Sequence, residues 1–351
     1  MNVRELPRSL EIDLLKTVSV IGIVIIHTAI YGYTYDIGSF NWTATVFWGS
    51  ITRASVPVFF MCSGALLLNP NKHLSISRLY SKNFLRLLIA LFFWATAYMV
   101  FHLLVEGPMS LNYTLSAIKN VLLFNHEQHL YYLHIILLVY VFIPVTRVFV
   151  RRASKSELEY FLVVWFILGI LYPTIKIFWP FTLLTGIPLQ WQINMTYAAI
   201  GYGVLGHYLR KYPVLKIYAL VLLAAGFVFV FGGTYIMSVK TGVLFQHFFE
   251  GMSVGVCLLA IGIFGVIIAA KSKCKGVEAP MAKIFLFLSK ASFCIFLVHV
   301  FFINIFDQLG LTVHLLPCLI SIPLISLFNI IFCITVYYVL FHIPVLNKWI
   351  I

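Results

Sequence analysis

The first apolar segment of the chain carries Asp13, Lys16 and His27, which are costly to place in a membrane unless they have a function. Lys16 and His27 lie about 20° apart around an α-helix and about 16 Å apart along its axis. Asp13 precedes Lys16 by one turn and shares its side. Because a histidine titrates near neutral pH, His27 could accept a proton at that depth. The alternative is a structural histidine that is bonded to a neighbouring helix.

Arg53 lies inside the second apolar segment, in the stretch SITRASVPVFFMCSG. An arginine in a membrane is costly unless it faces a polar cavity or an anion, so Arg53 is a candidate for binding negative charge. The alternative is an Arg53 side chain that extends to the lipid head groups. Pro57 predicts a kink in this helix, and the Ser63–Gly64 pair allows close helix packing.

Arg78, Lys82 and Arg86 follow one another at four-residue spacing before the third apolar segment, so they share one face of a helix. Such a face suits the phosphates of a cofactor on the cytoplasmic side. Cations at this place also follow from ordinary membrane topology, since cytoplasmic loops are rich in Lys and Arg. Both explanations stay open at this point.

The link before the fourth apolar segment reads NHEQHLYYL and contains His126, Glu127, His129, Tyr131 and Tyr132. These side chains at a membrane surface suit carbohydrate, which they bind through hydrogen bonds and ring stacking. The tyrosines also fit the ordinary aromatic belt of membrane interfaces. The spacing of His126, Glu127 and His129 matches no zinc signature, so we expect no metal site.

The ninth apolar segment places Ser292 and His299 seven residues apart on one helix face, with His299 at a depth comparable to that of His27. Glu250 is the only carboxylate that we expect well inside a span, and its role stays open. No phosphate-loop, dinucleotide-binding, serine-hydrolase or zinc-protease motif occurs. Four further histidines are interpreted as packed or interfacial: His102, His134, His207 and His247.

The composition shows that these residues lie in a membrane: 62% of the 351 residues are hydrophobic and only 10% are charged. Soluble domains contain about 25% charged residues, so a soluble protein is excluded, as is a disordered one. The apolar runs lack the alternation of outer-membrane strands, which excludes a β-barrel. Ten runs are long enough to span a bilayer, and they cover residues 14–34, 44–68, 83–105, 129–149, 157–178, 193–209, 214–237, 243–270, 284–306 and 315–341.

Short links between these segments leave no room for a soluble domain, so we expect one all-α, polytopic helical bundle over residues 1–351. Of the 24 Lys and Arg residues, 20 are assigned to one side and three to the other, with Arg53 inside the second span, which places both termini in the cytoplasm. The net charge of +13 then reflects topology and anionic lipids, and no nucleic-acid partner is expected. The charged N-terminus has no cleavage site, so the first span should be retained. Six cysteines without paired spacing are interpreted as small buried hydrophobes.

Several of these motifs resemble those of the acyltransferase-3 family of membrane acyltransferases. Lys16, ten residues and His27 resemble the family's Arg/Lys-x10-His signature. The stretch around Arg53 and Pro57 is similar to its Arg…Val-Pro-x-Phe-Phe…Ser-Gly motif, and HLYYL and SFCIFLVH resemble two further segments. The chain looks most similar to the O-acetyltransferases of enterobacterial common antigen, and O-succinyltransferases of an adhesion polysaccharide are relatives. Lys16 in place of Arg, and tyrosine in place of Trp in HLYYL, depart from the usual pattern.

The resemblance implies transfer of an acetyl group from cytoplasmic acetyl-CoA to a hydroxyl of a lipid-linked or surface glycan, without a metal, in the bacterial inner membrane. His27 would act as general base or transient acyl carrier, beside Asp13 and Arg53 as further catalytic residues. The remaining site residues fall into two groups. Lys16, Arg78, Lys82 and Arg86 would hold the CoA phosphates, and Glu127, His129, Tyr132, His299 and Ser63 would bind the acceptor.

Three alternatives to an O-acetyltransferase stay open from the sequence. The donor could be succinyl-CoA. The protein could be a transporter or flippase for a lipid-linked glycan, although the inverted repeats typical of transporters are not visible. A structural or sensory membrane protein would leave the register of Lys16 and His27 unexplained. The glycan, its hydroxyl and the oligomeric state are not predicted.

Overall fold

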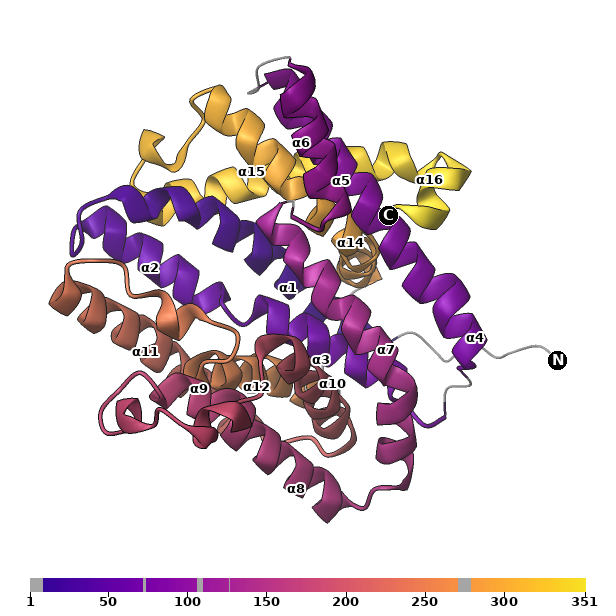
Figure 1. Cartoon of the computed structure of the whole chain (residues 1–351), viewed down its shortest axis with the longest axis vertical. Helices are drawn as coiled ribbons and strands as arrows, with labels where there is room; N and C mark the ends of the chain where they lie inside the picture. The colour runs from indigo at the N-terminus through magenta and orange to yellow at the C-terminus, as the bar shows by residue number, and fades with distance from the viewer. Residues whose placement is uncertain (1–8, 72–73, 106–109, 126, 271–278) are drawn as a thin grey trace.

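The structure is a computed structural model of the chain, and it describes residues 9–71, 74–105, 110–125, 127–270 and 279–351. These residues form helices and connecting turns, and no strand occurs among them (Figure 1). An all-α polytopic bundle is therefore confirmed. The helices are α1 (Leu10–Ala29), α2 (Phe40–Thr52), α3 (Ser55–Leu67), α4 (Ile76–Arg78), α5 (Leu85–Val105), α6 (Leu111–Leu122), α7 (Tyr131–Arg152), α8 (Lys155–Phe166), α9 (Tyr172–Ile175), α10 (Met195–Lys211), α11 (Lys216–Thr241), α12 (Val254–Ala269), α14 (Ala279–Gln308), α15 (Cys318–Phe341) and α16 (Pro344–Trp349).

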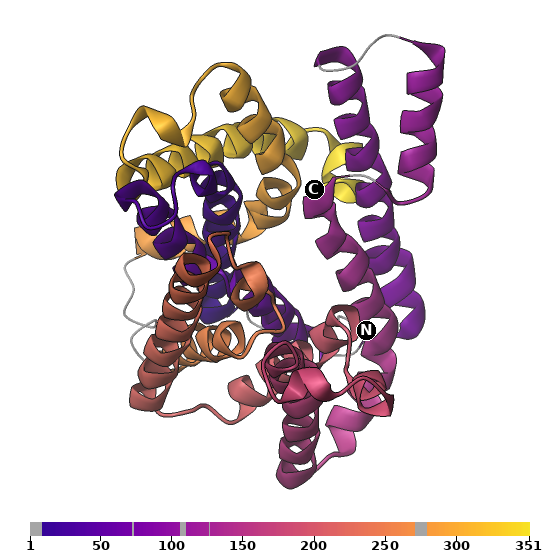
Figure 2. The ribbon, with the colours of Figure 1, turned by 60° about the vertical axis from the view of Figure 1, so that its left-hand side comes forward.

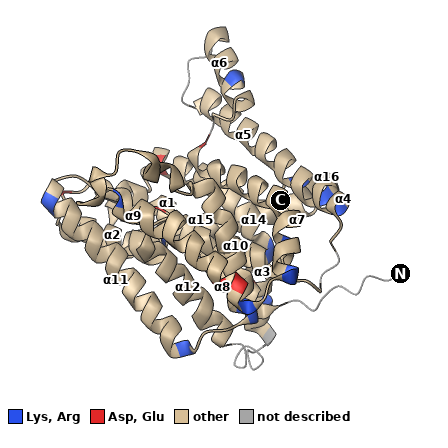
Figure 3. Cartoon of the chain, turned by 60° about the horizontal axis from the view of Figure 1, so that its bottom comes forward, with Lys and Arg blue, Asp and Glu red and all other residues tan. Residues whose placement is uncertain are grey.

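Nine helical segments of the described chain are long and apolar enough to cross a membrane. They correspond to nine of the ten expected spans. The tenth, expected at 193–209, is α10, whose 17 residues lie at the short end of spanning lengths. Most Lys and Arg residues lie near helix ends (Figure 3), and α11 carries Lys216 and Lys240 near its two ends. This distribution fits a multi-pass membrane protein.

The second expected span is two helices, because α2 ends at Thr52 and α3 begins at Ser55. Pro57 has no N–H to donate to the carbonyl of Arg53 and crowds that carbonyl, so the helix breaks one turn before the proline. The kink expected at Pro57 is therefore a break at Arg53 and Ala54. The break places Arg53 where its side chain reaches the 3-10 turn before α12.

Helix α1 lies at the centre of the bundle, where it packs against α2, α3, α14 and α15. Its residues Leu15, Val24 and Ala29 are fully buried. Helices α5 and α6 stand at an edge of the bundle, away from α11 and α12, as Figure 2 also shows. The catalytic candidates on α1 are thus surrounded by protein, whereas α5 has one side open to lipid.

Helices α3 and α10 pack backbone against backbone through glycines. A Cβ added at Gly64 would collide with the backbone of Gly203, and one added at Gly206 would collide with the carbonyl group of Met61. Such close contacts through small residues are a common way for helices to associate in membranes. The contact between α3 and α10 holds Ser63 and Gly64 in place, close to the N-terminal end of α1.

We expect the substitution Gly64→Ala to destabilise the protein, because neither backbone can move without separating α3 from α10. Overpacking of this kind costs about 1–3 kcal/mol, which lowers Tm by several degrees. The measurement is thermal unfolding in detergent. The matched control is Gly232→Ala on α11, where an added Cβ meets no atom within 4 Å. An equal Tm for both variants would contradict the proposed packing.

Candidate active site

Three histidines from distant parts of the chain meet near the C-terminal end of α1. The ring centroids lie 4.9 Å apart for His27 and His299, 5.4 Å apart for His129 and His299, and 6.2 Å apart for His27 and His129. His27 comes from α1, His129 from a 3-10 turn (Gln128–Leu130) and His299 from α14. His299 is fully buried, whereas His27 is only half-buried. The cluster therefore has one histidine that a substrate can reach.

The hydrogen bonds of His299 assign its protonation form. Nδ1 lies 3.2 Å from the carbonyl oxygen of Ile295 and 2.7 Å from that of Phe296. Because a carbonyl only accepts, Nδ1 carries the hydrogen, and in the neutral ring Nε2 is the acceptor. This Nε2 is buried and has no partner among the described residues. A hydrogen bond donated by the neighbouring His27 would satisfy it.

Arg53 is held beside this cluster. Its Nε donates to the carbonyl oxygen of Phe249 at 2.6 Å, and its guanidinium carbon lies 4.6 Å from the centre of the Phe249 ring. Its charge acts electrostatically on His27. The side chain is half-buried and anchored to protein, so it does not extend to lipid head groups as the alternative required. No hydrogen bond of its two terminal nitrogens is found among the described residues, and Tyr33 and Glu250 act on its charge.

The other end of α1 carries a second group of charges. Asp13 is buried and accepts a hydrogen bond from Ser289 Oγ of α14 at 2.6 Å. Lys16 and Arg210, with Asp13, act electrostatically on the thiol of Cys62 in α3, so all three gather at this end of α1. Arg210 of α10 also donates to the carbonyl oxygen of Ala65 at 2.9 Å.

The sequence alone did not single out Arg210. It was counted only among the topology-setting cations, since nothing in its spacing connects α10 with α1. Lys16 and Arg210, which both act on Cys62, give this end of the helix a positive charge that suits phosphate. Asp13 lies about 21 Å along the helix from His27, so it cannot touch the reacting atoms there. A role for Asp13 at the histidine cluster does not fit this distance, and its function stays a prediction.

Arg78, Lys82 and Arg86 are not equivalent, although their spacing predicted one shared face. Arg78 and Lys82 are exposed in α4 and in a π-helical turn (Leu79–Phe84). Arg86 is half-buried, donates to the carbonyl oxygen of Ile351 and lies over the Phe293 ring at 5.6 Å. Only Arg78 and Lys82 are therefore free to meet a solvent-borne ligand.

Glu127 borders a polar pocket of about 360 Å³ between α5 and α6. Its Oε1 lies 2.7 Å from Nε2 of His102, and the amides Asn120 and Gln128 also line the pocket. Tyr98 forms part of the wall and places its ring 5.0 Å from that of His129. One aromatic side chain thus separates this pocket from the histidine cluster.

Tyr98 and His102 were not predicted as site residues, and His102 was interpreted as a packed histidine. Tyr98 and His102 are one helical turn apart on α5, but nothing in their spacing connects them with Glu127. His126, which was considered for a metal site, lies outside the described residues. Among the residues that the structure describes, no group of His, Cys, Asp or Glu side chains is arranged to hold a metal ion.

Two predicted acceptor-binding residues, Tyr132 and Ser63, do not line the pocket. The Tyr132 ring packs against Phe60 at 5.1 Å and Phe296 at 5.0 Å. Ser63 donates back to the carbonyl oxygen of Phe59 at 3.0 Å, within its own helix. Glu250, expected inside a span, instead follows a short 3-10 turn before α12 and is exposed. Its charge acts on Arg53 from that side.

The comparisons with known proteins identify the family of the chain. The family model described as an acyltransferase domain, of the acyltransferase-3 type, matches residues 9–341. No curated protein and no solved structure gives a significant match. The family match favours an enzyme over the transporter that the sequence left open. With its membrane-spanning helices, the chain belongs to the acyltransferase-3 family and is a membrane acyltransferase.

Proposed function

We propose that this membrane acyltransferase transfers an acetyl group from acetyl-CoA to a hydroxyl of a glycan at the bacterial inner membrane, as the O-acetyltransferases of enterobacterial common antigen do. The observation that carries the proposal is the position of His27. It lies half-buried between the cations Lys16 and Arg210 on one side and the pocket around Glu127 on the other. Donor and acceptor would thus reach the same imidazole from opposite ends.

The cations near the N-terminal end of α1 suit the phosphates of acetyl-CoA, the acyl donor. Lys16 and Arg210 would bind the phosphates of acetyl-CoA at the cytoplasmic end of α1, with the exposed Arg78 and Lys82 as outer contacts. Arg86, bonded to the chain itself, would contribute little direct binding. The pantetheine arm would then extend along α1 for the roughly 16 Å that separate Lys16 from His27.

The chemistry would follow from the groups around His27. His27 takes the proton of the acceptor hydroxyl as its oxygen attacks the thioester carbonyl carbon. The resulting oxyanion collapses, the bond between carbon and sulfur breaks, and the CoA thiolate takes up the proton. The terminal nitrogens of Arg53 would stabilise the oxyanion, and Nε2 of His299 would accept the other N–H of His27. In the covalent variant, His27 itself carries the acetyl group before the sugar.

The acceptor would bind from the outer side. Glu127, His102 and the amides around them offer hydrogen-bond donors and acceptors to sugar hydroxyls. His129 would continue this surface towards His27, whose ring centroid lies 6.2 Å away, whereas Tyr132 and Ser63, bonded or packed within the protein, would contribute little direct binding. No Lys or Arg lines the described part of the pocket, so an uncharged sugar fits it better than an acidic one.

The experiment is acyl transfer by the purified protein in nanodiscs, with labelled acetyl-CoA or succinyl-CoA and a lipid-linked acceptor that contains N-acetylglucosamine. We expect label on the sugar with acetyl-CoA. The variant Arg210→Gln should raise KM for acetyl-CoA about tenfold, the usual effect of one lost charge-assisted contact, with kcat little changed. The matched control is Lys240→Gln, at the far end of α11. Failure to release CoA with any donor and acceptor would refute the proposal.

A further inference from the structure

Arg53 by itself makes an incomplete binding site for the oxygen that becomes negatively charged during acyl transfer. Enzymes hold such an oxygen with several preorganised hydrogen-bond donors. Arg53 contributes its terminal nitrogens, since its Nε is already bonded to the carbonyl oxygen of Phe249. A second donor would have to lie near Arg53, at the depth of His27, and without a hydrogen-bond partner in the protein.

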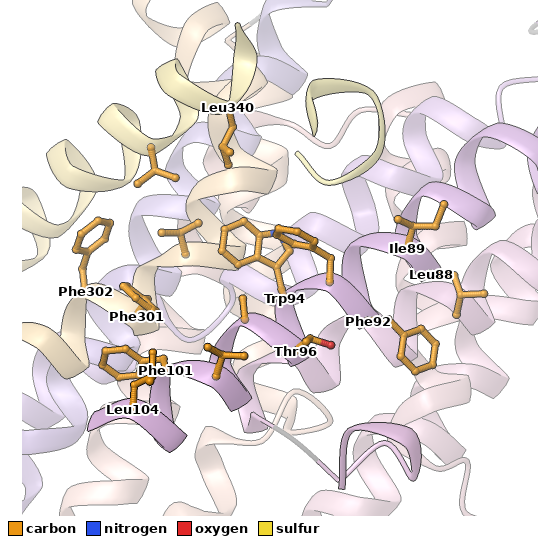
Figure 4. A pocket seen from close by; sticks show the side chains of 15 residues that line it. Leu88, Ile89, Phe92, Trp94, Thr96, Phe101, Leu104, Phe301, Phe302 and Leu340 are labelled. Carbon is orange, nitrogen blue, oxygen red and sulfur yellow. The ribbon is translucent and has the colours of Figure 1, made fainter. Parts of the chain in front are cut away.

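The apolar groove along α5 does not supply this donor (Figure 4). It encloses about 980 Å³ between α5, α14 and α15, and hydrocarbon or phenyl side chains form its described lining apart from Thr96 and Trp94. Thr96 is exposed on α5, and the indole N–H of Trp94 already donates to the carbonyl oxygen of Ile350 at 3.0 Å. The groove thus suits hydrocarbon chains and not a carbonyl oxygen.

The contacts between the first two helices show which part of α2 lies at the depth of His27. A Cβ added at Gly32 would meet Thr45, and one added at Gly22 would meet Thr52, so the two helices run antiparallel. The turn of α1 that carries His27 lies midway between the two glycines. It is therefore opposite the residues of α2 that lie midway between the two threonines.

Gly49 is one of those α2 residues, and the hydroxyl of Tyr33 packs against it. A Cβ added at Gly49 would collide with this hydroxyl, so only glycine leaves room for it. Arg53 follows Gly49 by four residues and shares its side of the helix. The Tyr33 hydroxyl thus lies at the depth of His27 and one helical turn from Arg53.

Phe249 packs against both Tyr33 and Arg53. Its ring centre lies 6.0 Å from that of Tyr33 and 4.6 Å from the guanidinium carbon of Arg53. Tyr33 acts electrostatically on Arg53, ahead of Glu250. Tyr33 is half-buried, and no hydrogen bond of its hydroxyl occurs in the part of the chain that the structure describes. Its O–H is therefore available to a ligand beside Arg53.

We propose that the O–H of Tyr33 and the terminal N–H groups of Arg53 together bind the carbonyl oxygen of the acetyl-CoA thioester, which makes Tyr33 a catalytic residue. This proposal rests on the proposed acyl transfer and adds a group to its site. As the acceptor oxygen attacks the carbonyl carbon, the electron pair of the C=O bond moves onto the carbonyl oxygen. The O–H bond of Tyr33 stays intact while its hydrogen bond to that oxygen strengthens. The C=O bond then re-forms, the carbon–sulfur bond breaks, and the sulfur takes up the proton that His27 removed from the acceptor.

Tyr33→Phe removes only the hydroxyl. We expect kcat for acetyl transfer in nanodiscs to fall about 10²–10³-fold, the usual loss for one donor of this kind, with KM for acetyl-CoA and Tm little changed. The matched control is Tyr35→Phe, because Tyr35 is also half-buried and follows the same 3-10 turn, but its ring packs against His314 at 4.9 Å. Normal kcat in Tyr33→Phe would refute the proposal. So would a higher KM for the sugar at unchanged kcat, which would make Tyr33 an acceptor-binding residue.

Gly49→Ala tests the same hydroxyl from the α2 side, because the added Cβ would displace it. In Tyr33→Phe this collision is absent, since the next atom of the ring, Cζ, would lie 3.4 Å from the new Cβ, an ordinary contact. We therefore expect Gly49→Ala to lower kcat about tenfold or more in the unchanged protein and no more than about twofold in Tyr33→Phe. Equal losses in both backgrounds would contradict the placement of the hydroxyl and with it the proposal.

Infrared spectra of bound acetyl-CoA separate this proposal from the function on which it rests. The probe is acetyl-CoA with ¹³C at its carbonyl carbon, without an acceptor, so no turnover is needed. Because a hydrogen bond weakens the C=O bond, its stretch should lie at lower wavenumber in the unchanged protein than in Tyr33→Phe. If this shift is found but no acetyl group is transferred to any sugar, the binding role of Tyr33 stands and the proposed reaction falls. If the shift is absent and Tyr33→Phe transfers acetyl groups at the normal rate, acyl transfer stands and the role of Tyr33 is refuted.

Discussion

Purified His27→Ala should bind acetyl-CoA normally and transfer the acetyl group about 10²–10⁴-fold more slowly than the unchanged protein, the usual loss when a general base is removed. No hydrogen bond of the His27 side chain occurs among the described residues, and the ring is only half-buried. Its removal should therefore leave the fold intact. The measurement is kcat for labelled acetyl transfer, together with Tm.

The control for this variant is His342→Ala, since His342 is exposed at the end of α15 and distant from the cluster. Transfer at the normal rate by His27→Ala would exclude His27 as base and as acyl carrier. Incubation with labelled acetyl-CoA and no acceptor separates the two roles. Label on the protein that is absent from His27→Ala would indicate an acyl-histidine, whereas an unlabelled protein with normal turnover would indicate a general base.

Arg53→Gln should lower kcat about 10²–10³-fold, as expected when a preorganised group that stabilises an oxyanion is removed. Arg53→Lys should recover only part of this loss, because lysine retains the charge but has no planar fork to donate to the Phe249 carbonyl while its other nitrogens face the substrate. The measurement is kcat and KM for both variants.

A purely structural Arg53 would give a different result. Its hydrogen bond connects the break between α2 and α3 with the turn that precedes α12. If that connection were its whole role, both variants would lose Tm and retain kcat in the molecules that remain folded. Phe249→Leu is the matched control, because it removes the ring beneath the guanidinium and leaves the carbonyl acceptor in place.

Much of the site could be predicted from local sequence. Lys16 and His27 belong to one helix, so their shared side and their separation follow from helical geometry alone. Pro57 predicted a disturbance of the second span, and the structure places the break one turn earlier because the proline acts on the carbonyl before it. Continuous apolar runs predicted the nine spanning helices, because a bilayer requires about 20 apolar residues per crossing; the tenth expected span is the shorter α10.

Other features of the site depend on distant contacts, which local sequence does not show. Four-residue spacing placed Arg86 with Arg78 and Lys82, but Arg86 is turned inward by the carbonyl group of Ile351. His102 is an ordinary histidine within its helix, and only the approach of Glu127 makes it part of a pocket. Ile351 is far from Arg86 in the sequence, and Glu127 is far from His102, so residue spacing could not predict either contact.

The sequence by itself determined the membrane-spanning class, the helical elements, the family and the Lys16–His27 register. These depend on composition, on periodicity and on residues within one helix. Only the tertiary structure decided that His129 and His299 join His27, that Arg210 joins Lys16, and that one side of α5 is a hydrocarbon groove. The physical reason is that helix packing sets the distance between residues far apart in the chain. That packing depends on the fit of all helices together, as where Gly64 meets Gly203.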